Sequence, residues 1–156
     1  MQAYSLEIND FWCAEYTLIG IHTPLNDYKL AYKLNQILDI RLIKASYELD
    51  FEDNFNKSSY PIFDYLDKEL DNSWFLITNV FKEKRKTDGI GLFEESYFKT
   101  FLIPEKKKVD YFLKIEGDLD YEFIIKMVDK INQIPQILTS YTIDSETLKS
   151  KENLIF

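Results

Sequence analysis

Residues 101–117, Phe-Leu-Ile-Pro-Glu-Lys-Lys-Lys-Val-Asp-Tyr-Phe-Leu-Lys-Ile-Glu-Gly, carry the strongest structural signals of the chain. Two apolar segments flank the lysines at 106–108, and this pattern predicts two strands joined by a charged tip. Gly117 and Asp118 then predict a turn. Beyond the turn, apolar residues recur at helical spacing over 121–132. We therefore predict a hairpin whose second strand leads through a turn into a helix.

A similar unit opens the chain. Residues 16–21 predict a buried strand, and Asn26 or Asp27 can cap a following helix. The apolar positions of this helix form one stripe, at Leu30, Ala31, Leu34, Ile37 and Leu38. Because a last strand is expected over 136–143, the chain begins and ends with a strand–helix–strand pattern.

Hairpins are expected between these two units. Polar and apolar residues alternate over 40–52, which predicts a strand with one wet, that is solvent-exposed, face. A short strand is expected over 60–66. Residues 74–81 are almost continuously apolar, a pattern typical of a strand buried on both faces. The charged residues 82–91 contain Gly89 and Gly91 and predict a loop, before a strand over 93–103.

The strands 74–81, 97–103 and 109–116 are expected to form a meander. In a meander the lysine-rich segments 82–86 and 106–108 lie at opposite ends of the sheet. We therefore interpret these segments as two separate solubilising turns that blunt aggregation, and not as one basic patch.

Together these elements predict an α+β fold. We expect a mixed, mostly antiparallel sheet with two helices on one face, built from ferredoxin-like βαβ units with inserted hairpins. Residues 1–143 are predicted to form a single domain. Residues 144–156 are predicted to be a tail that is loosely ordered or forms a short helix.

Composition narrows the class of protein. The chain has 156 residues and 46% hydrophobic content, which suits one folded domain with a sizeable core. The net charge of -8 makes the protein acidic and argues against binding to nucleic acid or to an anionic membrane. The single cysteine, Cys13, excludes an internal disulfide. No signal peptide or membrane span is expected, and we predict a cytoplasmic protein.

Several common chemistries lack the residues that they need. His22 is the only histidine and Cys13 the only cysteine, so catalytic triads and tetrahedral zinc sites are not supported. The four glycines do not form a phosphate-binding loop. Glu48, Asp50 and Glu52 share one strand face, which can be a site for Mg²⁺ or Ca²⁺ or simply a solvated face; we favour the solvated face. We predict a protein without catalytic activity, cofactor or metal.

One motif carries a family resemblance. Ile103-Pro104-Glu105 is followed after three residues by Val109-Asp110-Tyr111. This spacing resembles the signature of the bacterial IPExxxVDY family, as do the upstream segments 18–21, 27–30 and 74–79. The resemblance implies a small bacterial protein of unassigned function, with no catalytic residue to transfer.

The motif has a structural and a functional interpretation. Pro104, Glu105, Asp110 and Tyr111 are the candidate functional residues, yet the same residue types are ordinary components of a hairpin. Across a tight hairpin, Glu105 and Asp110 could form an acid/base pair. The lysines at 106–108 would lower both pKa values, whereas a general acid needs a raised one. We favour the structural interpretation.

Two functions fit this pattern. The first is a non-catalytic protein-interaction module that binds an unknown protein or a second copy of itself through a strand edge or an aromatic face. The alternative is a small-ligand-binding regulatory domain of the ACT type. Its ligand would lie at the turn of Gly117 and Asp118, where a helix begins and free backbone N–H groups can bind a carboxylate.

Overall fold

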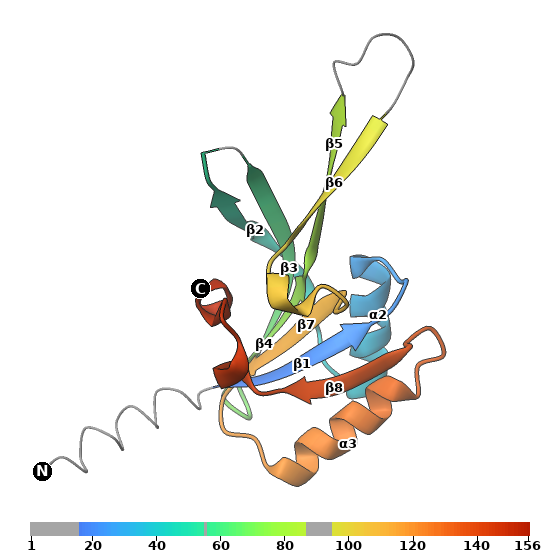
Figure 1. Cartoon of the computed structure of the whole chain (residues 1–156). Helices are drawn as coiled ribbons and strands as arrows, with labels where there is room; N and C mark the ends of the chain where they lie inside the picture. The colour runs from blue at the N-terminus through green and yellow to red at the C-terminus, as the bar shows by residue number, and fades with distance from the viewer. Residues whose placement is uncertain (1–15, 55, 87–94) are drawn as a thin grey trace, which may run out of the picture.

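A computed structural model describes residues 16–54, 56–86 and 95–156 (Figure 1). The elements follow one another as β1 (Tyr16–His22), α2 (Asp27–Leu38), β2 (Ile43–Glu52), β3 (Lys57–Asp67), β4 (Asn72–Thr78), β5 (Val80–Lys86), β6 (Glu95–Phe101), η1 (Pro104–Lys106), β7 (Tyr111–Glu116), α3 (Tyr121–Asn132), β8 (Thr139–Ile143), η2 (Ser145–Thr147) and η3 (Lys151–Leu154). The three η elements are short 3-10 helices. The prediction of an α+β fold is confirmed.

The main sheet has the strand order β2-β3-β4-β7-β1-β8, and each neighbouring pair is antiparallel. Strands β8-β1-β7-β4, together with α2 and α3, form the ferredoxin-like arrangement of two interleaved strand–helix–strand units. The hairpin β2–β3 is inserted between α2 and β4 and extends the sheet. A second pair, β5–β6, is inserted between β4 and β7 and forms a separate two-stranded sheet.

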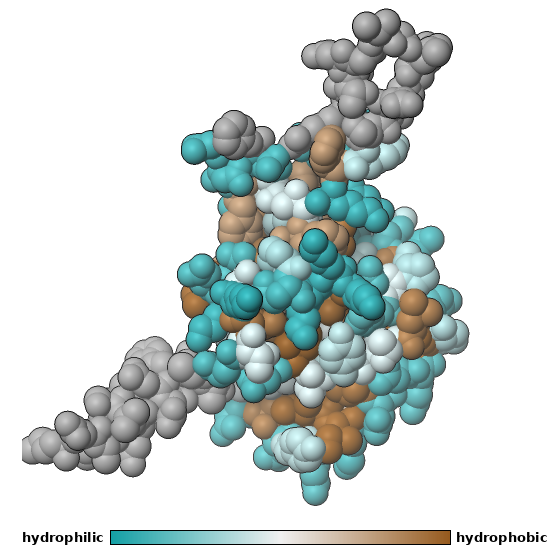
Figure 2. All heavy atoms as spheres, viewed as in Figure 1, coloured by the Kyte–Doolittle hydropathy of each residue, from teal (hydrophilic) through white to brown (hydrophobic). Residues whose placement is uncertain are grey.

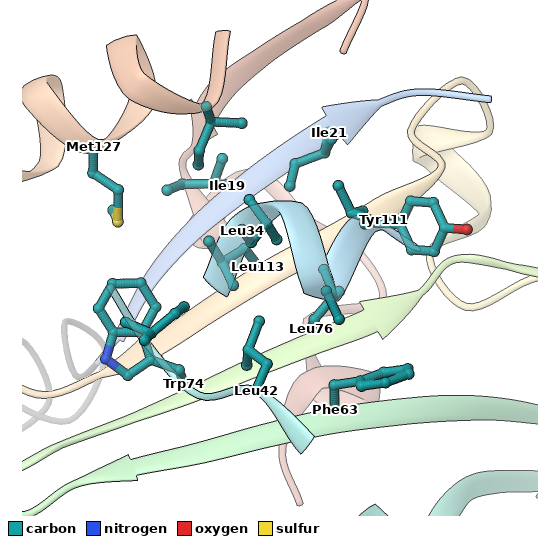
Figure 3. Packing of buried hydrophobic residues seen from close by; sticks show 14 of the residues in the cluster. Ile19, Ile21, Leu34, Leu42, Phe63, Trp74, Leu76, Tyr111, Leu113 and Met127 are labelled. Atoms are coloured by element: carbon teal, nitrogen blue, oxygen red, sulfur yellow. The ribbon is translucent and has the colours of Figure 1, made fainter. Parts of the chain in front are cut away.

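Both helices cover the same face of the sheet. The apolar stripe of α2 buries Leu30 and Leu34, and α3 buries Met127 and Ile131. These side chains pack on residues that β1, β4 and β7 direct toward the helices, including Ile19, Trp74 and Leu113 (Figure 3). Asn26 caps α2 as predicted, since its side chain accepts a hydrogen bond from the N–H of Lys29.

The opposite face of the sheet is covered by the end of the chain. Leu148 and Leu154 are buried there, together with Leu102, Ile103 and Val109 from the segment before β7. Of the two forms predicted for residues 144–156, the short helix is observed and the loosely ordered tail is not, because η2 and η3 form there and Leu148 and Leu154 complete a second core. The sheet needs this cover because Leu18 of β1, Ile77 of β4 and Phe112 of β7 are apolar and point to this face.

The apolar run 74–81, predicted as one strand, is two strands. It divides at Asn79 into β4, in the main sheet, and β5, in the separate ribbon. The predicted loop 82–91 is also wrong over 82–86, which belong to β5; residues 87–91 lie outside the described part. Strand 93–103 is observed as β6 over 95–101.

The predicted meander and hairpin are wrong. β4 pairs directly with β7, and β6 pairs with β5 and not with β7. The charged segment 106–108 instead begins with the last residue of η1 (Pro104–Lys106) and continues into the loop before β7. The cause is the polar residue Asn79, whose hydrogen bonds end β4 and hold the loop before β7.

Residues 43–52 form strand β2, with an irregular register between Lys44 and Glu48. The prediction of only one wet face is corrected, because Leu49 is the single buried residue of β2 and both of its faces are largely exposed. Leu49 joins the second core, and the ring of Phe51 contacts that of Tyr60 edge to face.

In the described part of the chain, no helix is long and apolar enough to cross a membrane.

Candidate functional site

The residues of the IPExxxVDY motif form a compact loop between β6 and β7. Pro104 begins η1, where the first turn needs no N–H from it. The N–H of Lys106 donates to the carbonyl of Ile103, and that of Val109 donates to the carbonyl of Lys106. Ile103 and Val109 are buried. The loop is thus fixed to the second core by its apolar residues.

Asn79 organises this loop from its buried position at the end of β4. Its Nδ2 donates to the carbonyls of Lys106 and Val109, at 2.9 and 2.7 Å, and its Oδ1 accepts from the N–H of Ile103 at 2.9 Å. Its backbone N–H and carbonyl bond to Asp110 and Leu102. The side-chain amide of Asn79 therefore supplies hydrogen-bond partners for three backbone groups of the motif loop. Sequence analysis missed Asn79; its signal was a polar residue inside an apolar run.

Glu105 connects the motif to the tail. Its carboxylate accepts from the backbone N–H of Ser150 at 2.7 Å and from the Ser150 hydroxyl at 3.0 Å. Desolvation raises the pKa of Glu105, but the hydrogen bonds from Ser150, together with those from the backbone of Glu105 and Lys149, outweigh this effect and the pKa is lowered overall. A carboxylate held in its ionised form is a poor general acid.

Asp110 and Tyr111 connect the motif to the loop between β1 and α2. Asp110 Oδ2 accepts from the N–H of Thr23 at 2.9 Å, and the Tyr111 hydroxyl donates to the carbonyl of Leu25 at 2.7 Å. Burial raises the pKa of Tyr111, and the charges of Asp27 and Asp110 raise it further, so the phenol stays protonated. Glu105 and Asp110 thus have different partners, and the structure does not join them in an acid/base pair.

The turn at Gly117 and Asp118 has its own steric explanation. Gly117 has a φ of 129°, and a Cβ placed there would lie 2.8 Å from Cβ of Asn72. Asp120 occupies the N-cap position of α3, without a hydrogen bond from its side chain to the helix. A hollow of about 550 Å³ includes Tyr121 and Ile124 of α3, but neither Gly117 nor Asp118 lines it.

A second polar residue missed by sequence analysis is Lys114, in the middle of β7. Its side chain is 3% exposed, donates to the carbonyl of Leu154 at 2.6 Å and pairs with Glu116 at 2.9 Å. The rings of Tyr16, Phe75 and Phe156 surround its Nζ at 4.4 to 5.6 Å from their centroids. The lysine therefore holds the tail against the sheet.

The remaining candidates also have structural partners. His22 Nε2 lies 2.8 Å from the Tyr141 hydroxyl, and Cys13 lies outside the described residues. The carboxylates of Glu48 and Asp50 on β2 both lie within hydrogen-bond distance of the hydroxyl of Ser59 on β3, which can donate to one of them at a time. Among the described residues, no three His, Cys, Asp or Glu side chains are placed to hold a metal ion.

Surface features of a different kind lie on the two β-ribbons that project from the body of the molecule. These are β5–β6 and the outer part of β2–β3 (Figure 1). Tyr97 and Phe98 of β6 are 63% and 45% exposed, and Tyr47 of β2 is 45% exposed. Apolar side chains are visible among hydrophilic ones on both ribbons (Figure 2). The ribbons thus present aromatic surface that neither core uses.

One lysine-rich segment lies on the ribbon β5–β6 and the other lies at the base of the same ribbon. Lys82 and Lys84 lie on β5, not in a turn, and share a face with Val80. Val80 lies opposite Phe101, and the Nζ of Lys107 lies 5.9 Å from the ring centroid of Phe101. The prediction that the two segments lie at opposite ends of the sheet is therefore wrong, because β6 returns the chain to the base of β5.

No family model, no curated protein and no solved structure matches this chain. The resemblance to the IPExxxVDY family therefore stays a hypothesis, which rests on the motif and on the upstream segments 18–21, 27–30 and 74–79.

Proposed function

We propose that this protein is a non-catalytic protein-interaction module that binds its partner through the projecting ribbons. The observation that carries the proposal is the exposure of Tyr97 and Phe98 on β6, together with that of Tyr47 and Phe51 on the other ribbon. Aromatic side chains of this type are enriched in the buried centres of protein interfaces.

The architecture of the ribbon supports the same conclusion. A two-stranded sheet is marginally stable by itself in water. Among the described residues, neither β5 nor β6 has a second strand neighbour, so both offer a free edge to an added strand. A partner strand would form hydrogen bonds with the backbone groups of this edge and would cover the exposed rings of Tyr97 and Phe98.

The non-catalytic part of the proposal is supported by how the motif is used. Glu105, Asp110 and Tyr111 each bond to the protein's own backbone, at Ser150, Thr23 and Leu25. A catalytic side chain needs to reach a substrate, and these groups are committed to holding loops together. A cytoplasmic location is part of the proposal and is favoured by the lone Cys13, since thiols stay reduced there.

Native mass spectrometry of the protein, purified gently from the cells that produce it, tests this proposal. We expect a complex with a second polypeptide or a second copy of the chain, and dissociation of that complex in a Tyr97→Ser, Phe98→Ser variant. A Tyr28→Ser, Tyr32→Ser variant, altered on the exposed face of α2, is the control and should keep the complex. A bare monomer would contradict the proposal.

The same measurement tests the regulatory-domain alternative. A bound small molecule, seen as added mass on a monomer, would favour a ligand-binding domain over an interaction module.

A further inference from the structure

The ribbon β5–β6 carries an unfavourable arrangement of charge. Lys82 of β5 and Lys99 of β6 are directly opposite each other in the register of the two strands. Like charges in this position repel and destabilise a sheet. Lys84 adds a third positive charge on the same face, beside Tyr97. We call this surface, made by Lys82, Lys84, Lys99, Tyr97 and Phe101, the lysine face.

The chain does not neutralise this pair itself. Neither Lys82 nor Lys99 forms an ion pair within the described part of the chain. Lys82 borders a hollow of about 380 Å³ whose walls also contain Asp27 and Glu48, but neither carboxylate pairs with it. In a protein with a net charge of -8, two lysines that face each other, neither with an ion pair to a described residue, are a local exception.

The spacing of the charges fits an extended peptide. Lys82 and Lys84 are two residues apart on one strand, so their side chains project from the same face about 7 Å apart. An added strand also presents alternate side chains to one face at that interval. Carboxylates at alternate positions of such a strand would face these lysines, while its backbone pairs with the free edge of the ribbon.

We infer that the lysine face binds an extended acidic segment of a partner protein, in which Asp or Glu occupies alternate positions. This inference rests on the proposed interaction function and names the chemistry of the partner. A nucleic acid is less favoured because its backbone cannot pair with the strand edge, and because the protein's negative charge repels a long polyphosphate.

Titration of the full-length chain with a fluorescent peptide tests the inference. The probe is a synthetic peptide of about ten residues in which glutamate alternates with threonine, long enough to span the ribbon. The matched peptide has glutamine at each glutamate position. We expect the acidic peptide to bind about tenfold more tightly than its glutamine counterpart, and its affinity to fall as salt is raised.

Variants of the protein locate the contact. The Lys82→Gln, Lys99→Gln variant should bind the acidic peptide about tenfold more weakly, whereas Lys29→Gln, Lys33→Gln on α2 removes equal charge and should change affinity less than about twofold. A Lys99→Glu variant should also lose binding although it removes the repulsion between the strands. That result would separate loss of binding from loss of folding.

Three outcomes would overturn the inference. The first is an equal loss of affinity for the acidic peptide in the two double lysine variants. The second is equal binding of the glutamate and the glutamine peptide, and the third is tighter binding of a thymidine oligonucleotide than of the acidic peptide. If the peptide does not bind while native mass spectrometry shows a polypeptide partner, the inference fails and the interaction function stands. If no partner is found but the peptide binds the lysine face, the affinity of this face for acidic peptides stands and the proposed interaction function fails.

Discussion

The side-chain oxygen of Asn79 lies 2.9 Å from the backbone nitrogen of Ile103, and this bond joins the end of β4 to the first residue of the motif. The chain leaves the main sheet at Asn79 to form the ribbon, and at Ile103 it begins the loop that leads back to the sheet at β7. A single buried carboxamide therefore closes the loop from which β5 and β6 project. The position of the ribbon β5–β6, which carries the proposed interaction surface, therefore depends on the hydrogen bonds of Asn79.

Replacing Asn79 with Ala should destabilise the fold. The substitution leaves the carbonyls of Lys106 and Val109 and the N–H of Ile103 without their partner. At about 1–3 kcal/mol for each buried unsatisfied group, we expect the free energy of unfolding to fall by about 3 kcal/mol or more. Urea denaturation measures this change. Asn54→Ala, at an exposed position, should stay within about 0.5 kcal/mol of the wild type; similar losses in both variants would contradict the role of Asn79.

Neutralising Glu105 should weaken the attachment of the tail in a pH-dependent manner. Its pKa is lowered from 4.5 in the folded protein, so its bonds to Ser150 contribute stability above about pH 4.5 and lose it as the pH falls through the lowered pKa. The stability difference between wild type and Glu105→Gln should be largest near neutral pH and shrink in acid. Because the carboxylate is largely exposed, the difference should be modest. A difference that is constant with pH would contradict this assignment.

Lys114→Met should loosen the tail without unfolding the sheet. Methionine keeps much of the side-chain volume among Tyr16, Phe75 and Phe156, but it cannot donate to the carbonyl of Leu154. Amide hydrogen exchange should become faster over residues 150–156 and stay slow in β1 and β7. Unchanged exchange in the tail would show that Lys114 does not hold it.

The repulsion between Lys82 and Lys99 predicts a substitution that stabilises the protein. Lys99→Glu converts a like-charge pair into an opposite-charge pair and should raise the free energy of unfolding by about 0.2–1 kcal/mol. Lys57 supplies the converse control, because it lies opposite Glu52 and forms an ion pair with it at 3.4 Å. Lys57→Glu should lower stability by a similar amount. Urea denaturation compares both, and a destabilised Lys99→Glu variant would refute the repulsion.

Gly117→Ala should be destabilising whether or not a ligand binds nearby. The positive φ and the close approach of Asn72 both disfavour a Cβ, at a cost of about 1–3 kcal/mol. Asp118→Ala, at the next and exposed position, should be nearly neutral. If Gly117→Ala is as stable as the wild type, the steric explanation of this glycine is wrong. Asp118 is thus the better position for testing a ligand at this turn.

Much of the fold follows from local patterns in the sequence. The apolar stripe of α2, the helical spacing of α3 and the strand–turn–helix signal at Gly117 are short-range features, and each is where it was predicted. Together they specify two strand–helix–strand units, and hence the α+β class. Local periodicity is sufficient here because helices and buried strands repeat their pattern over several residues.

The errors arose where a single polar residue is matched by a distant partner. Asn79 divides an apolar run only because Ile103, Lys106 and Val109 bond to it, and Lys114 is buried only because the tail folds over it. Periodicity contains no information on such long-range partners. The lysine face escaped notice for the same reason, since Lys82 and Lys99 become neighbours only once β5 pairs with β6.

Site-specific photo-crosslinking in living cells tests the central claim most directly. A photoreactive phenylalanine analogue is placed at Tyr97 on the ribbon and, in a matched control, at Tyr28 on α2; these side chains are 63% and 60% exposed. The account predicts a discrete crosslinked polypeptide from position 97 that is absent from position 28. A crosslinking pattern that is the same at both positions, or no product from position 97, would contradict the assignment of the ribbon as the interaction surface.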